Sequence, residues 1–127
     1  MKHQTILAAL ALAAAGSLFA ASNDKHDDHT AQHGGLVVPG KAADFELVAT
    51  PEVLHLYLSD HGKPMDVADA SAKVTLLAGT EKQEVELKPV GNRLEARGTF
   101  KVGAGTKIVA VVSRSGKTLG TARFTLR

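Results

Sequence analysis

Strict alternation of apolar and polar residues along two neighbouring segments is the strongest constraint on the fold of this 127-residue chain. The segments are residues 43–49 and residues 53–58, with the turn sequence Thr50-Pro51-Glu52 between them. Apolar residues occupy every second position of both segments: Phe45, Leu47, Ala49, Leu54, Leu56 and Leu58. A period of two is typical of antiparallel strands with one buried face. The pattern therefore predicts a β-hairpin with an apolar inner face.

Further short segments with apolar alternation follow at even spacing and predict five more strands. They are residues 73–78, 83–88, 93–101, 107–112 and 118–126. Helical periodicity is weak after the first 21 residues, and we allow at most a helical turn within residues 65–72. About seven short strands with regular turn signals are typical of a small sandwich. We expect residues 36–127 to form one all-β domain, a small antiparallel Ig-like β-sandwich.

Residues 1–21 have the composition of a secretory signal peptide. A short basic start, Met1-Lys2-His3, precedes an apolar run at residues 6–15 and small residues near Ala20 and Ala21. This run is shorter than the about 20 apolar residues that a membrane-spanning helix needs. We therefore expect export, cleavage near Ala20 or Ala21, and no membrane anchor afterwards. The chain has no cysteine, so the exported domain must be stabilised by core packing without disulfides.

Composition argues against nucleic-acid binding and against catalysis. The formal net charge is +2, the basic residues are scattered, and aromatic residues make up 4% of the chain. A basic stripe with stacking side chains is therefore missing. No nucleophile lies in a recognisable elbow motif, and no glycine-rich phosphate loop precedes a helix. We expect a binding protein that is not an enzyme and has no nucleic acid among its partners.

Three of the six histidines gather in one polar segment, residues 22–35, which follows the predicted signal peptide. His26, His29 and His33 are three and four residues apart, so a flexible segment can wrap them around one ion. Imidazole and carboxylate groups suit divalent zinc, copper and nickel. We predict that residues 22–35 are a flexible His-rich segment that captures a divalent transition metal. The alternative is a solvated polar linker.

His55 and Glu46 form a second group of candidate ligands on the predicted hairpin. With a turn at residues 50–52, Glu46 faces Tyr57 across the hairpin. Glu46 and His55 are then diagonal neighbours on the outer face, about 7 Å apart at Cβ. This separation suits two ligands of one metal ion, and it equally suits a cross-strand hydrogen bond.

His33 and His61 extend this set in different ways. The Gly34-Gly35 pair permits a reversal of the chain that returns His33 to the outer face of the hairpin. His61 lies six residues beyond His55, about 20 Å along an extended strand, which is too far for both to bind one ion. With Asp60, Met65 and the His-rich segment it forms a second, weaker candidate site, in which the Met65 thioether would favour copper(I). The alternative is an ordinary polar turn.

Four short motifs occur in order along the chain: His33-Gly34-Gly35, Phe45-Glu46-Leu47, Leu56-Tyr57-Leu58-Ser59-Asp60 and Gly62-Lys63-Pro64. This order resembles the N-terminal domain of periplasmic adaptor proteins, the membrane-fusion subunits of heavy-metal RND efflux systems. It is also similar to the small free-standing periplasmic proteins related to that domain. The resemblance implies a small β-sandwich, a role in metal tolerance and an efflux-pump component as partner. The coiled-coil hairpin and barrel domains of an adaptor have no counterpart here, so metal binding or delivery is what carries over.

The sequence therefore predicts a periplasmic metal-binding protein that acts as a buffer, sensor or carrier in heavy-metal or copper resistance. Its predicted ligands are His26, His29, His33, Glu46, His55 and His61. The expected cofactor is a divalent transition metal such as zinc, copper or nickel. The alternative is a non-catalytic Ig-like module with a structural or protein-interaction role.

Overall fold

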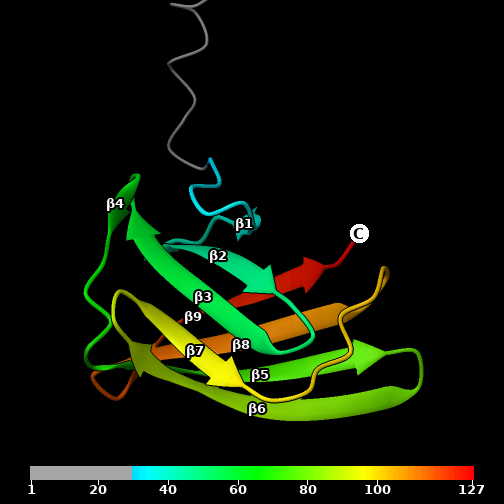
Figure 1. The fold of residues 1–127 in the computed structure, drawn as a ribbon. Coiled ribbons are helices and arrows are strands. Elements are labelled where there is room, and N and C mark those ends of the chain that lie inside the picture. The colour runs from blue at the N-terminus through cyan, green and yellow to red at the C-terminus, as the bar shows by residue number, and fades with distance from the viewer. Residues whose placement is uncertain (1–29) are drawn as a thin grey trace, which may run out of the picture.

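The computed structural model describes residues 30–127, which form nine strands that all pair antiparallel (Figure 1). In chain order they are β1 (Leu36–Val38), β2 (Asp44–Ala49), β3 (Val53–Asp60), β4 (Lys63–Pro64), β5 (Ala70–Ala78), β6 (Glu81–Val90), β7 (Arg93–Arg97), β8 (Lys107–Arg114) and β9 (Lys117–Thr125). The prediction of an all-β domain is confirmed. Within this part of the chain, no helix has the length and apolar character needed to cross a membrane. The predicted signal peptide, His26 and His29 lie outside the described residues.

The strands form one continuous hydrogen-bonded path that folds over on itself. The strand order is β1-β2-β3-β7-β6-β5-β8-β9, with β4 added to β3. Strand β6 joins the two layers, because residues 81–87 pair with β5 and residues 88–90 pair with β7. Strand β1 also contacts β9, so the path is nearly closed into a barrel (Figure 1). Two layers face each other as in the expected sandwich, but a shared strand connects them.

Two of the nine strands are too short for a sequence pattern to predict, which explains why about seven were expected. Strand β1 has three residues, which pair with residues 45–47 of β2. Strand β4 has two residues, Lys63 and Pro64, which pair with the end of β3. Pro64 lies at the edge of the sheet, where the missing N–H of a proline breaks no ladder hydrogen bond.

The segment at residues 65–72 contains no helical turn, which corrects the sequence-based expectation. Instead, the Asp66 carboxylate accepts a hydrogen bond from the Ala68 N–H at 2.9 Å. A local bond of this kind stabilises a tight turn and competes with helix formation. Strand β5 then begins at Ala70.

The strand expected at residues 93–101 is shorter than its sequence pattern predicts. Strand β7 ends at Arg97. Beyond it, the N–H groups of Gly98 and Phe100 donate to the carbonyls of Glu52 and Pro51 in the β2–β3 turn. These bonds tie the chain after β7 to the first hairpin, and the Phe100 ring still packs in the core at 5% exposure.

The predicted first hairpin is present with the predicted register. Glu46 pairs with Tyr57 across the β2–β3 ladder. Leu54 and Leu56 are 0% exposed, so the inner face of β3 lies in the core as the alternation indicates. Leu94 of β7 lies beside Leu56 in the same layer, and buried side chains of β5, β6 and β8 complete the core: Val74, Leu76, Leu87, Ile108 and Val112. Burial of one face fixes which side chains point outward, and these outward residues form the candidate site.

Candidate functional site

The outer face of the β2-β3-β7 layer carries the candidate functional residues. Alternation along the strands places Glu46 of β2 beside Tyr57 of β3. On the other side of β3, His55 lies directly opposite Glu95 of β7. The face therefore presents two carboxylates, one imidazole and one tyrosine ring.

The described end of the His-rich segment folds back onto Glu46, as the Gly34-Gly35 pair allows. Glu46 Oε1 accepts a hydrogen bond from the Gln32 N–H at 3.0 Å. Glu46 Oε2 accepts bonds from the N–H groups of His33, at 2.8 Å, and Gly35, at 2.9 Å. The Glu46 side chain is 8% exposed, so three backbone donors surround a nearly buried carboxylate.

Both glycines are needed for this return of the chain. Gly34 has a φ of +76°, in the left-handed region that favours glycine. Gly35 has no room for a side chain, because a Cβ there would lie 2.3 Å from the Leu47 carbonyl oxygen. The pair lets the backbone approach strand β2 closely enough to form β1.

Glu46 also holds the ring of His33. The Nδ1 atom of His33 lies 3.0 Å from Glu46 Oε1. Burial raises the pKa of Glu46, but the hydrogen bonds from Gln32, Gly35 and His33 outweigh it and hold the pKa below 4.5. The carboxylate is therefore ionised at neutral pH and can only accept hydrogen bonds. His33 must accordingly donate from Nδ1.

The His33 ring stacks on the sheet. It lies parallel to the Tyr57 ring, with centroids 3.5 Å apart and an interplanar angle of 4°. His55 meets Tyr57 edge-on, with centroids 6.2 Å apart and an angle of 72°. Beside the stack is a cavity of about 60 Å³, lined in part by His33, Tyr57 and the carboxyl-bearing residues Asp44 and Glu46. A space of this size admits a few waters or a small ion.

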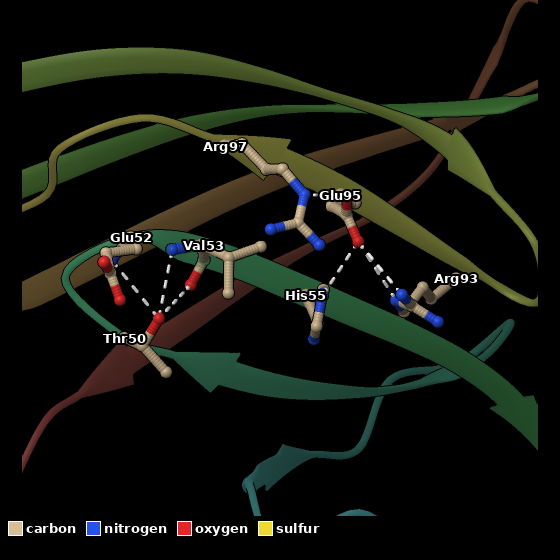
Figure 2. Close-up of polar contacts among 7 residues, drawn as sticks. All are labelled: Thr50, Glu52, Val53, His55, Arg93, Glu95 and Arg97. Carbon is tan, nitrogen blue, oxygen red and sulfur yellow. Dashed lines mark hydrogen bonds and ion pairs between the residues drawn. The ribbon is translucent and has the colours of Figure 1, made fainter.

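His55 belongs to a separate charged cluster centred on Glu95 (Figure 2). His55 Nε2 lies 2.9 Å from Glu95 Oε1, and Arg93 Nη2 donates to the same oxygen at 3.1 Å. Arg97 Nε donates to Glu95 Oε2 at 2.9 Å. Burial raises the pKa of Glu95, but the bonds from Arg93, Arg97 and His55 lower it by more, so the net pKa falls below 4.5.

His61 lies away from both clusters, in the turn between β3 and β4. Its side chain is 79% exposed, and its Nδ1 atom lies 3.7 Å from Asp60 Oδ1. The turn is nevertheless linked to the His-rich segment, because the Gln32 side-chain amide donates to the Gly62 carbonyl at 3.2 Å.

The structure thus brings His33 to Glu46, while His55 pairs with Glu95 instead of Glu46. Across residues 30–127, no three His, Cys, Asp or Glu side chains are grouped closely enough to hold a metal ion. Sequence reasoning did not find Glu95 or the stacking role of Tyr57. The alternation at residues 93–97 does place Glu95 on an outward position, but no local signal shows that β7 pairs with β3.

Comparisons with known proteins assign no family to the chain. No protein-family model matches it, and no curated protein matches it. It is similar to a solved structure described as "Crystal structure of Br derivative BhCBM56", at 9% identity and a TM-score of 0.44. The match covers 72% of this chain and 99% of that one. A likeness at this level carries no argument about function.

Proposed function

We propose that the protein is an exported metal-binding protein that holds a divalent transition metal through the histidines of residues 22–35. The observation that carries the proposal is the position of His33. Its Nδ1 atom is bound to a carboxylate and its ring is stacked on Tyr57, while no residue within 30–127 hydrogen-bonds to its Nε2 atom. Histidines that bind metals commonly donate their other ring N–H to a carboxylate in this way.

The described residues supply only part of such a site. His33 offers one imidazole nitrogen, and a closed site for zinc or copper needs three or four ligands. His29 and His26 precede His33 by four and seven residues and are the nearest histidines along the chain. A neutral imidazole binds metal and a protonated one does not, so acidification releases the ion. This behaviour suits a reversible buffer or carrier.

Two histidines of the β2–β3 hairpin and the turn that follows it are further candidate ligands. His55 remains a candidate ligand through its second ring nitrogen, because only Nε2 faces Glu95. His61 lies on the turn that contacts Gln32, where it is a candidate for a weaker, exposed site. The composition of residues 1–21 supports a periplasmic location, and an efflux-pump component remains the partner that we propose for metal delivery.

The proposal is tested by titrating the protein without residues 1–21 with zinc, nickel and copper(II) by calorimetry. Tyr57 is the one tyrosine of the chain, and there is no tryptophan, so tyrosine fluorescence reports on the ring beneath His33. We expect micromolar or tighter binding, quenching of that fluorescence by copper(II), and a large loss of affinity in His33→Ala.

The matched control is Gln83→Ala, because the Gln83 side chain makes its hydrogen bond to the Thr99 carbonyl, far from the His33–Glu46 pair in the sheet order. This variant should bind metal like the unaltered protein. If the folded protein binds none of the three metals at neutral pH, the proposal is wrong and the interaction-module alternative replaces it.

A further inference from the structure

We infer that Glu46 is a positioning residue for the metal and not one of its ligands. It holds His33 with the proton on Nδ1, so that the ion enters at Nε2. This inference rests on the proposed function. It also changes the role of Glu46, which the sequence pattern alone presents as a ligand.

The Glu46 carboxylate has no acceptor position left for a metal ion. Oε1 accepts from the Gln32 N–H and the His33 ring, and Oε2 accepts from the N–H groups of His33 and Gly35. A carboxylate has about four acceptor positions, and all four are in use. A metal bound to Glu46 would displace at least one of these donors, and a displaced backbone N–H at this nearly buried position is costly.

The His33 ring is held in one orientation. The ring is held at Nδ1 by Glu46 and across its face by Tyr57, so its plane and its tautomer are both fixed. Nε2 is separated from Nδ1 by Cε1, points away from the Nδ1–Glu46 bond and carries the lone pair in this tautomer. The carboxylate therefore prepares a single donor atom before any metal arrives.

His55 shows the opposite arrangement on the same face of the sheet. Its Nε2 atom faces the Glu95 carboxylate, so Nε2 carries the proton and Nδ1 is the atom left to donate. The two histidines beside Tyr57 are thus expected in different tautomers. This contrast gives an internal reference within one protein.

The first experiment measures tautomers by nitrogen-15 NMR of the imidazoles in the metal-free protein at neutral pH. We expect His33 as the Nδ1–H form and His55 as the Nε2–H form. In Glu46→Gln, we expect His33 to shift towards the Nε2–H form while His55 is unchanged. Glu84→Gln makes the same chemical change at an exposed position of β6 and should leave both histidines as they are.

The second experiment measures zinc affinity in Glu46→Gln, His33→Ala and the double variant. If Glu46 acts through His33, Glu46→Gln should lower the zinc affinity by about 10- to 100-fold while His33 is present. It should have no further effect once His33 is absent. An additional loss of similar size in the double variant shows direct contact with the metal and overturns the inference.

The two experiments separate failure of this inference from failure of the proposed function. An Nε2–H form of His33 in the metal-free, unaltered protein overturns the positioning role whatever the metal affinity. The absence of zinc binding by the unaltered protein removes the function, and with it any metal that Glu46 helps to place.

Discussion

His33 lies face to face with Tyr57, with ring centroids 3.5 Å apart, although the two residues are on different segments of the chain. The stack covers the outer face of the first hairpin with the end of the His-rich segment. Glu46 adds four hydrogen bonds to the same short stretch of chain. Together the Tyr57 ring and the Glu46 carboxylate hold residues 32–35 of the His-rich segment against the outer face of the sheet.

Removal of the Tyr57 ring should loosen this docked segment without unfolding the sheet. An aromatic stack contributes about 0.5–1.5 kcal/mol beyond its buried area. In Tyr57→Ala we therefore expect hydrogen exchange of the Gln32, His33 and Gly35 amides to accelerate by about 2- to 10-fold. Tyr57→Phe keeps the ring and should exchange like the unaltered protein. Equal exchange in both variants would show that Glu46 alone holds the segment.

Gly35→Ala should destabilise the protein by removing the close approach of the chain to β2. The new Cβ would lie 2.3 Å from the Leu47 carbonyl oxygen and 2.9 Å from the Val48 side chain. Backbone oxygen cannot move aside as a flexible side chain can, so we expect a loss of about 1–3 kcal/mol in urea unfolding. Gly103→Ala is the control, because a Cβ there meets nothing within 4 Å. A loss as small as that of the control would mean that β1 does not contribute to global stability.

The first hairpin was predictable because the residues that determine it are close together in the sequence. Alternation assigned the inner face of β2 and β3, and the turn at residues 50–52 set the register that pairs Glu46 with Tyr57. Strands β1 and β4 carry three and two residues, too few for any period to be visible. Their pairing depends on where the neighbouring strands end, which is a property of the whole sheet.

The candidate site was only half predictable, because part of it depends on pairing between strands that are distant in the sequence. The return of His33 to the hairpin follows from the Gly34-Gly35 pair. The partner of His55 does not, because Glu95 is 40 residues away and reaches His55 through the β3–β7 pairing. A sequence pattern shows that Glu95 points outward, but not which strand lies beside it.

Thr50 should stabilise the turn that sets the register of the hairpin. Its hydroxyl donates to the Val53 carbonyl at 3.1 Å and accepts from the Val53 N–H at 3.0 Å (Figure 2). Thr50→Val keeps the shape of the side chain but removes these bonds, so we expect a loss of about 1 kcal/mol in denaturant unfolding. Thr121→Val, at an exposed position of β9, should change stability by less than about 0.5 kcal/mol. A cost at Thr50 no larger than at Thr121 would show that the backbone alone sets the turn.

The cluster around Glu95 should make stability fall when the solution is acidified. Hydrogen bonds from Arg93, Arg97 and His55 hold the pKa of Glu95 below its ordinary value of 4.5 in the folded protein. At pH values between the lowered pKa of the folded protein and the ordinary pKa of the unfolded chain, the unfolded chain binds more protons than the folded one. The free energy of unfolding therefore rises with pH across that interval. The contribution of Glu95 is therefore complete above pH 4.5 and is lost as the pH falls through the lowered folded pKa.

This dependence is measured by urea unfolding of the unaltered protein and Glu95→Gln from neutral pH down to the acid limit of folding. The glutamine variant cannot titrate at this position, so the stability difference between the two proteins should be constant near neutrality and shrink at acid pH. Glu84→Gln is the control, because its carboxylate is 72% exposed and 3.7 Å from Lys82. Its difference from the unaltered protein should remain small throughout. A Glu95→Gln difference that stays constant down to the acid limit would show that the arginines bind the folded carboxylate too weakly to couple it to folding.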